Sequence, residues 1–251
     1  MKIIKYKKGA KGIYKVELED GRVLSLYEEV ILKFELLLKK EILDVDLKEI
    51  NDYNLECDVY YVALNNIKAR FKSTYDLTLF LQKKEYPNDL IDKAIEKLMK
   101  QGYLNDRSYA RSYINNQMIT TSKGPLKLER ELLDKKIDSN IINEEMYIFD
   151  EDTQKEKITK IVNKGLKSNR TRGGNILKQK IYNDLKLLGY DNLLINSVIN
   201  NYTFENDSDI AKREYDKLYR RLSRKYSGRE LESKIREKLF QKGLKYEGEE
   251  Y

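Results

Sequence analysis

Residues 173–190 read GGNILKQKIYNDLKLLGY, and residues 227–244 read SGRELESKIREKLFQKGL. Aligned without a gap at an offset of 54 residues, the two stretches are identical at six positions. The identical pairs are Gly174 with Gly228, Leu177 with Leu231, Lys180 with Lys234, Ile181 with Ile235, Leu185 with Leu239, and Gly189 with Gly243. In both stretches the apolar residues follow helical spacing, and a glycine stands where the helix would end. An internal repeat of this length predicts helical units that stack on one another.

The same frame extends toward the N-terminus in a weaker form. Tyr86, Ile137, Tyr190 and Leu244 occupy the same place in four successive units, at spacings of 51, 53 and 54 residues. Leu81, Leu132, Leu185 and Leu239 precede them, and we expect these four leucines to fill equivalent buried positions. Each unit has room for three helices, except the fourth, because the sequence ends at Tyr251.

The expected fold is therefore mainly α. It consists of elongated tandem three-helix repeats, three plus a partial fourth, with a small N-terminal α+β module that contains a β-hairpin. The predicted divisions are 1–57 for the N-terminal module, 58–104, 105–154 and 155–204 for helical repeats 1 to 3, and 205–251 for the partial repeat 4.

The N-terminal module differs from the rest in its periodicity, and we expect residues 1–26 to be β. Residues 13–18 and 22–26 alternate apolar and polar side chains, and Asp20-Gly21 lies between them. Asp-Gly between two alternating runs is a strong signal for a β-hairpin. After it we expect a helical stretch from Tyr27 to about Lys39, and another from about Asp46 to Leu55.

Local helix signals support the repeat reading further along the chain. Both prolines, Pro87 and Pro125, stand where a helix should start. Asn88 or Asp89 can cap the first of these helices, and Gly102 can end it. Asn105 or Asp106 can then cap the next helix. Helix capping explains Asp89 and Asp106 fully, without a catalytic role for either carboxylate.

Several residue types needed for catalysis are missing. The chain has no histidine, so histidine-based acid–base catalysis and histidine metal ligation are excluded. Its single cysteine, Cys57, excludes intrachain disulfides and cysteine-rich zinc sites, and a half-buried structural role suits it better than that of a nucleophile. The sequence also lacks a phosphate-binding P-loop and a G-x-G-x-x-G motif. No apolar run is long enough to span a membrane, and no secretory signal begins the chain, so we expect a cytoplasmic protein.

Positive charge is concentrated in two blocks. Residues 155–190 and 211–245 each carry a net charge of +8, although the whole chain carries only +7. Such blocks favour polyanionic partners, either nucleic acid or an acidic protein surface. The simpler alternative is a set of solvated helix faces with surplus lysine.

One stretch of 52 residues resembles a known family. Residues 63–114 read ALNNIKARFKSTYDLTLFLQKKEYPNDLIDKAIEKLMKQGYLNDRSYARSYI, which is similar to the core of the RecX regulatory proteins. The elements that carry this resemblance are Ala63-Leu64, Arg70 with Ser73, Leu77 with Leu81, Leu98 with Gly102-Tyr103-Leu104-Asn105-Asp106, Tyr109-Ala110, Lys123-Gly124-Pro125, Glu131-Leu132, Lys136-Ile137 and Gly189-Tyr190. The resemblance covers residues 60–200, and residues 1–57 resemble the N-terminal extension of longer members.

The resemblance implies a function as well as a fold. RecX proteins are tandem three-helix repeats that bind in the groove of the RecA recombinase filament on DNA. They mostly inhibit its ATPase and strand-exchange activities in recombination, DNA repair and the SOS response. The expected protein is thus a cytoplasmic monomer, not an enzyme, that needs no cofactor or metal and binds no membrane. A weak direct contact with DNA is expected beside the RecA filament.

Basic residues near the starts of the predicted helices are the candidate partner-binding residues. They are Arg70, Lys72, Lys123, Lys127, Arg170, Arg172, Arg220, Arg221, Arg224 and Lys225. Cations near a helix N-terminus do not complement the helix dipole, so partner contact explains them better than local stability does. Among the tyrosines, Tyr86, Tyr109, Tyr113 and Tyr190 fall on apolar stripes and are expected in the core. Tyr215, Tyr219 and Tyr226 lie among arginines, where stacking on nucleic-acid bases is conceivable.

A second functional class stays open at this stage, a stand-alone nucleic-acid-binding helical repeat protein. Such a protein should carry basic recognition helices in every unit. Residues 105–154 instead carry a net charge of −3. This imbalance favours the RecA regulator.

Overall fold

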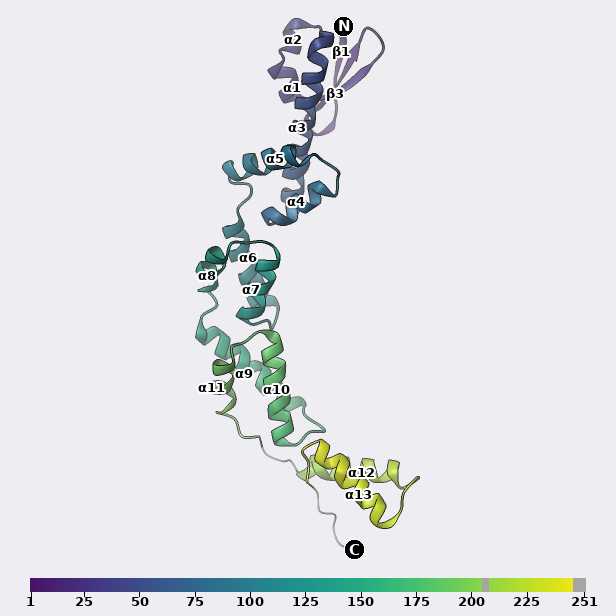
Figure 1. Cartoon of the computed structure of the whole chain (residues 1–251), viewed down its shortest axis with the longest axis vertical. Coiled ribbons are helices and arrows are strands. Elements are labelled where there is room, and N and C mark those ends of the chain that lie inside the picture. The colour runs from purple at the N-terminus through teal and green to yellow at the C-terminus, as the bar shows by residue number, and fades with distance from the viewer. Residues whose placement is uncertain (205–207, 246–251) are drawn as a thin grey trace. The chain divides into compact units, whose positions relative to one another are not determined.

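The computed structural model describes the backbone of residues 1–204 and 208–245, and every side chain in these ranges except that of Lys11. These residues divide into two compact units. Figure 1 shows the order of the helices and strands along the chain. One unit comprises residues 1–109 with 135–137, and the other comprises residues 110–134 with the described part of 138–251. The two ends of the predicted fourth repeat, 205–207 and 246–251, lie outside the described residues.

The N-terminal module contains an antiparallel sheet in the order β1-β2-β3. Its strands are β1 (Ile3–Lys8), β2 (Ile13–Leu18) and β3 (Val23–Tyr27), and a short 3-10 helix η1 (Ala10–Gly12) joins the first two. The predicted hairpin is confirmed as β2–β3, with Gly21 at a φ of 85° in the turn. The β structure expected for residues 1–26 also includes β1, whose bounds the sequence did not locate; it is an edge strand that carries three lysines in six residues. Edge strands are often lysine-rich, because charge discourages pairing with another chain.

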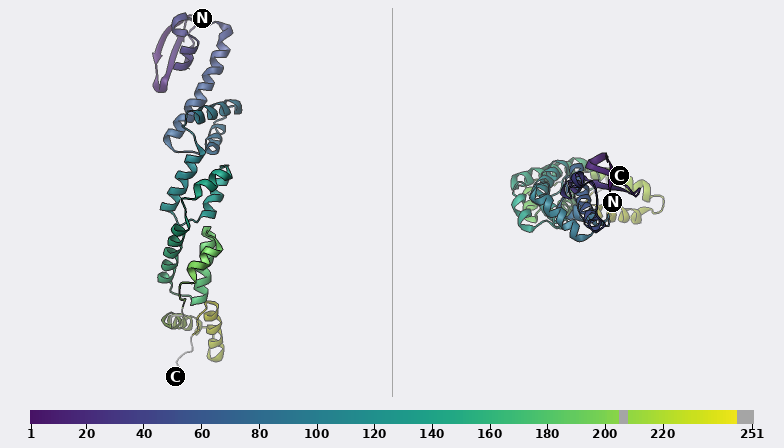
Figure 2. Two further views of the ribbon diagram at one scale, coloured as in Figure 1. Left: turned by 90° about the vertical axis from the view of Figure 1, so that its left-hand side faces the viewer. Right: turned by 90° about the horizontal axis from the view of Figure 1, so that it is seen from above.

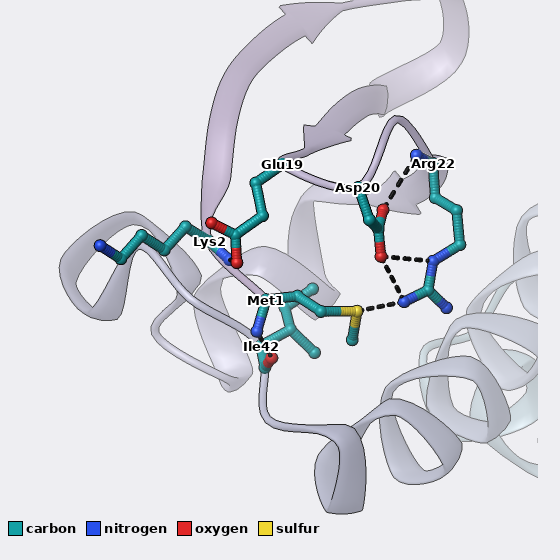
Figure 3. A network of polar contacts seen from close by, with 6 residues as sticks. All are labelled: Met1, Lys2, Glu19, Asp20, Arg22 and Ile42. Carbon is teal, nitrogen blue, oxygen red and sulfur yellow. Dashed lines mark hydrogen bonds and ion pairs between the residues drawn. The ribbon is translucent and has the colours of Figure 1, made fainter.

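Polar contacts tie the start of the chain to this sheet (Figure 3). The amino group of Met1 donates to the carbonyl of Ile42 at 2.9 Å, and the N–H of Lys2 donates to the carboxylate of Glu19 at 3.0 Å. Asp20 accepts from the guanidinium of Arg22, which also contacts the Met1 sulfur. This hydrogen bond from Arg22 holds the pKa of Asp20 below its ordinary value. These contacts tie the sheet to the segment just before Asp44.

The helical stretch expected from Tyr27 to Lys39 is divided in two. Helix α1 (Glu28–Lys33) and helix α2 (Leu36–Lys39) are separated by Glu35, whose φ is 52°. A non-glycine residue in the left-handed region ends an α-helix, and the sequence carries no glycine that would have signalled it. The two helices nevertheless bury Val30, Ile31 and Leu36 in the same core as the sheet.

The next helix corrects one prediction. Helix α3 spans Asp44–Ala69, 26 residues, whereas the expected helix ended at Leu55. No glycine or proline interrupts this stretch, so nothing local stops the helix. Its N-terminal half, with Ile50 and Cys57, packs with the sheet. Its C-terminal half packs with α4 (Thr74–Gln82) and α5 (Asn88–Lys100). In Figures 1 and 2 the helix leaves the strands and continues into the next helices.

A half-buried carboxylate on α3, that of Asp58, joins the sheet to the first repeat. The hydroxyl of Tyr27, at the end of β3, donates to Asp58 at 2.7 Å. The hydroxyl of Tyr86, from the first repeat, donates to the other oxygen of Asp58 at 2.5 Å. Burial, together with these hydrogen bonds, raises the pKa of both phenols. Tyr86 is therefore half-buried and bonded, not available for stacking.

Helices follow one another through the remaining described residues, where no strand occurs after residue 60. They are α4 (Thr74–Gln82), α5 (Asn88–Lys100), α6 (Asp106–Thr120), α7 (Pro125–Asp134), α8 (Ser139–Met146), α9 (Glu151–Ser168), α10 (Gly174–Leu188), α11 (Asn192–Ile199), α12 (Ser208–Leu222) and α13 (Gly228–Gln241). The predicted division at 154/155 falls inside α9, whose N-cap is Asp150, so we place that boundary before α9 and keep the other divisions as proposals.

The predicted caps are partly confirmed. Asn105 caps α6 by accepting the N–H of Ser108 at 2.9 Å. The carboxylate of Asp106 instead accepts the N–H of Thr74, the first residue of α4, at 2.8 Å. Neither Asn88 nor Asp89 caps α5, because the cap position is Pro87 and both residues lie in the first turn. Gly102, with a φ of 76°, ends the turn after α5 as expected.

The repeat frame is visible in the backbone. The four leucines expected at equivalent sites are at most 2% exposed, and each has a residue of positive φ four positions later. These residues are Glu85, Lys136, Gly189 and Gly243, at φ values of 63°, 58°, 88° and 69°. A residue in the left-handed region just after a helix turns the chain back, so that the next side chain packs against the last turn of that helix. Ile137, Tyr190 and Leu244 are buried in this way, and Tyr86 is half-buried.

Main-chain hydrogen bonds join the start of one repeat helix to the end of the next one. The N–H of Gly124, just before α7, donates to the carbonyl of Leu188 in α10 at 2.7 Å. The N–H of Gly173, just before α10, donates to the carbonyl of Lys242, after α13, at 2.8 Å. A Cβ on Gly124 would lie 2.6 Å from the carbonyl oxygen of Gly189, so the first joint requires glycine. We call these contacts the inter-repeat joints.

Candidate partner-binding surfaces

Helix α12 carries the densest group of exposed cations. Its two sides differ, because Ile210, Ala211, Leu218 and Leu222 are buried against α13 on one side. The cations line a shallow cavity of about 380 Å³ on the other side. We call Arg213, Lys217, Arg220, Arg221 and Arg224 the α12 cationic surface. Spacings of four, seven and eight residues from Arg213 place the first four on one stripe of the helix, and Arg224 follows in the turn after it.

Few acidic groups neutralise this surface. Among the residues that the structure describes, Asp216 is the one carboxylate that lines the same cavity. None of the five cations forms an ion pair within 4.0 Å with another residue of the described ranges. The Nε of Arg213 donates to the backbone carbonyl of Asp209 at 3.0 Å. The surface therefore presents a local excess of positive charge that attracts anions.

Three of the predicted residues, Arg220, Arg221 and Arg224, belong to this surface, but the reason given for the first two was wrong. Arg220 and Arg221 lie in the last turn of α12, not at a helix N-terminus. Cations there complement the helix dipole, so local stability does account for part of their placement. Arg224 and Lys225 lie in the turn before α13 and are exposed. Lys225 is not among the residues lining the cavity.

The tyrosines among the arginines divide into two kinds. Tyr219 is 48% exposed, and its ring stacks on that of Tyr215 with a centroid distance of 6.2 Å. Tyr215 and Tyr226 are half-buried and pack against the α12–α13 core. Tyr219 alone of the three therefore offers a largely open ring. The expected core positions of Tyr109 and Tyr190 are confirmed, since both are buried.

The remaining candidates have local surroundings of different kinds. Arg70 ends α3, so it too lies at a helix C-terminus, and Lys72 is half-buried. Lys123 forms an ion pair with Glu131 at 2.7 Å. Arg170 donates to the carbonyls of Lys167 and Asn169, both at 2.9 Å, which fixes the loop after α9. Arg172 is exposed in the same loop, and Lys127 lines a second cavity.

Arg213 and Lys217 were missed in the sequence, as were Arg130 and Lys186 beside Lys127. The signal for the first two was present, because Arg213 stands eight and Lys217 four residues before Arg221. Not every C-terminal lysine is available, however. Lys242 donates to the buried carboxylate of Glu214, which is a structural pair between α12 and α13.

The described residues show little that suits catalysis. Burial, and then the nearby Glu29, raises the pKa of Cys57 to about 12, which leaves its thiol protonated and unreactive. No group of three or more potential metal ligands occurs among these residues. None of the helices that the structure describes is both long and apolar enough to cross a bilayer.

Comparison with known proteins matches this arrangement to a family. A family model described as the second three-helix domain of RecX matches residues 105–146, which hold α6, α7 and α8. The regulatory protein RecX of Streptococcus gordonii is 30% identical over 98% of this chain and 96% of its own length. The chain belongs to the RecX family of regulatory proteins. The RecX protein of Listeria monocytogenes is 29% identical over 93% of this chain and 88% of its own length.

Solved structures of the RecX family share the fold. One crystal structure of a regulatory protein RecX aligns with a TM-score of 0.70 at 22% identity, covering 80% of this chain and 99% of the other. The crystal structure of RecX from Lactobacillus salivarius aligns with a TM-score of 0.57 at 25% identity, covering 59% and 97%. The resemblance seen in the sequence is thereby confirmed, as is the mainly helical fold with an N-terminal sheet.

Proposed function

We propose that this RecX-family protein binds the RecA recombinase filament on DNA and lowers its ATPase and strand-exchange activities. It would act in recombination, DNA repair and the SOS response as a cytoplasmic regulator, not an enzyme. The observation that carries the proposal is the match to regulatory RecX proteins over nearly the whole chain. The names of these relatives describe regulation rather than catalysis.

The α12 cationic surface supports the DNA side of this proposal. Duplex DNA carries one negative charge per about 1.7 Å of its axis, so a filament on DNA presents a dense row of phosphates. Four of the five cations are arginines, whose planar guanidinium groups can donate two hydrogen bonds to one phosphate. We propose that this surface faces the DNA within the filament, while other surfaces contact RecA.

A stand-alone nucleic-acid-binding protein is the second candidate function. The exposed ring of Tyr219 beside the arginines favours it, because aromatic side chains and cations together bind single strands. The net charge of −3 on residues 105–154 counts against it, since one repeat would then lack a basic surface.

RecA-dependent ATP hydrolysis on single-stranded DNA tests the proposal. The protein is titrated into preformed filaments with DNA in large excess over it, so that masking a fraction of the DNA cannot lower the rate. We expect hydrolysis to fall as the protein approaches a small fraction of the RecA concentration. Inhibition that disappears when more DNA is added would instead indicate the second candidate, a protein that competes with RecA for DNA.

A further inference from the structure

A second cavity lies at the inter-repeat joint between α7 and α10. It measures about 470 Å³, and its walls come from the first turns of α7, the last turn of α10 and the start of α11. The side chains that matter here are Leu126, Lys127 and Arg130 on α7, with Lys186 and Leu187 on α10. We call this space the joint cavity.

The walls of the joint cavity are held by main-chain contacts. Besides the hydrogen bond of the joint itself, the N–H of Leu126 donates to the carbonyl of Gly189 at 3.0 Å. The hydroxyl of the buried Tyr190 donates to the carbonyl of Ser122 at 3.2 Å. A site fixed in this way needs little reordering when a partner binds, which preserves binding free energy.

Two leucines that line this cavity are exposed to solvent. Leu126 is 48% exposed and Leu187 is 77% exposed, and both line the same space. Scattered exposed leucines are ordinary on protein surfaces. Two that share one preformed cavity are more typical of a protein contact.

The cations around the cavity are unpaired, whereas its carboxylates already have partners. Lys127, Arg130 and Lys186 form no ion pair within 4.0 Å with any residue the structure describes. Glu131 is paired with Lys123 at 2.7 Å and accepts the Tyr113 hydroxyl at 2.7 Å. Asp191 caps α11, since its Oδ1 accepts the N–H of Leu193 at 2.7 Å. The free charge at the rim is therefore positive.

We propose that the joint cavity docks a segment of a protein partner in which acidic side chains flank an apolar one. The leucines would receive the apolar side chain, and the three cations would pair with the carboxylates. Nucleic acid fits less well, because single strands stack on open aromatic rings. The one tyrosine that lines this cavity, Tyr190, is buried and bonded. The identification of RecA as the source of the segment rests on the proposed function; the chemistry of the site does not.

A photo-crosslinking amino acid in place of Leu187 tests the occupant directly. Its high exposure makes this position tolerant of substitution. With RecA filaments on single-stranded DNA, we expect cross-links to RecA peptides that contain Asp or Glu next to an apolar residue. Cross-links to the DNA, or to a basic RecA segment, would overturn the inference.

Charge reversal gives a second readout. The variant Arg130→Glu with Lys186→Glu should bind RecA filaments about tenfold more weakly, equivalent to about 1.4 kcal/mol. The matched control reverses Lys164 and Lys167, exposed lysines on α9 that lie outside the cavity, and should bind like the wild type. Equal affinities of the two variants would contradict the assignment.

A synthetic peptide separates failure of this inference from failure of the proposed function. The probe is a fluorescent peptide of alternating Glu and Leu, compared with one of alternating Lys and Leu. We expect the wild type to bind the acidic peptide only, and the α7–α10 double variant to lose that binding. Peptide binding without RecA binding would refute the proposed function alone. Loss of discrimination between the two peptides would refute the joint cavity as an acidic docking site.

Discussion

Neutralising part of the α12 cationic surface should flatten the salt dependence of DNA binding. The perturbation is Arg220→Gln, Arg221→Gln and Arg224→Gln in one variant, which leaves Arg213 and Lys217 in place. Each phosphate contacted by a single-strand binder contributes about 0.7 to the slope of log affinity against log salt. Five contacts therefore predict a slope of about 3.5, and the two that are left predict about 1.4.

These slopes translate into a measurable difference. Between 50 and 200 mM salt, a fourfold change, wild-type affinity should fall about 130-fold, whereas that of the triple variant should fall only about sevenfold. The fold should survive, because the three side chains are exposed. Losing two favourable charges from the last turn of α12 costs roughly 1 kcal/mol, which lowers the thermal midpoint by about 2–4 °C.

Fluorescence anisotropy of a labelled oligonucleotide, alone and within RecA filaments, measures the slopes. The control variant replaces Arg229, Arg236 and Lys238 on α13 with Gln, so that net charge falls equally while the α12 cationic surface stays intact. If both variants flatten the salt dependence to the same degree, overall charge is responsible. If neither variant flattens the salt dependence, the α12 cationic surface is only solvated. Arg170 and Arg172 then become the next candidates for DNA contact.

Three further predictions concern stability. Leu185→Ala should lower the free energy of unfolding by about 2–5 kcal/mol, and a loss below about 0.5 kcal/mol in denaturant titration would refute the repeat frame. Gly189→Ala should lower the free energy of unfolding more than Gly228→Ala does. Both glycines have positive φ, but a Cβ on Gly189 would lie 2.5 Å from the backbone nitrogen of Lys127, whereas a Cβ on Gly228 would have no atom within 4 Å. Equal losses of stability in the two variants would show that the inter-repeat joint adjusts to the added methyl group. Burial alone would raise the pKa of Glu131, but hydrogen bonds from Lys123 and Tyr113 lower it on balance. The contribution of the Glu131 carboxylate to stability is therefore present above pH about 4.3 and is lost as the pH falls through the lowered pKa. The difference in unfolding free energy between the wild type and Glu131→Gln should therefore disappear in acid. A gap that is unchanged at pH 3 would contradict this sign.

Turns and helix ends that depend on residues adjacent in the sequence could be predicted. Asp20-Gly21 indicated its hairpin because the turn needs a positive φ that glycine adopts without strain. Gly189 and Gly243 marked helix ends for the same reason. At Glu85 and Lys136 the same backbone conformation occurs without glycine, and only the spacing of the repeats located those two helix ends.

Features set by distant residues were not predictable in this way. Asp106 has a capping residue's chemistry, but its partner, Thr74, lies 32 residues earlier in the chain. The placement of Arg220 relative to a helix end depended on whether α12 stopped at Leu222 or continued toward Gly228, and no strong breaker stands between them. The sequence located the cationic block correctly, yet only the packing of α12 on α13 shows which cations share one side.

The inter-repeat joints have a consequence for how such a chain can change over evolutionary time. Their hydrogen bonds run between main-chain atoms, Gly124 to Leu188 and Gly173 to Lys242, so the joint requires little of most side chains. A unit copied by gene duplication would bring with it both the donor and the acceptor needed to attach to its neighbour. Thereafter the copies could drift apart in sequence wherever the small residues at the joint and the buried leucines were kept. Joints that depend on the main chain would let the fold persist while the sequence changes, as in the RecX crystal structure that aligns with a TM-score of 0.70 at only 22% identity.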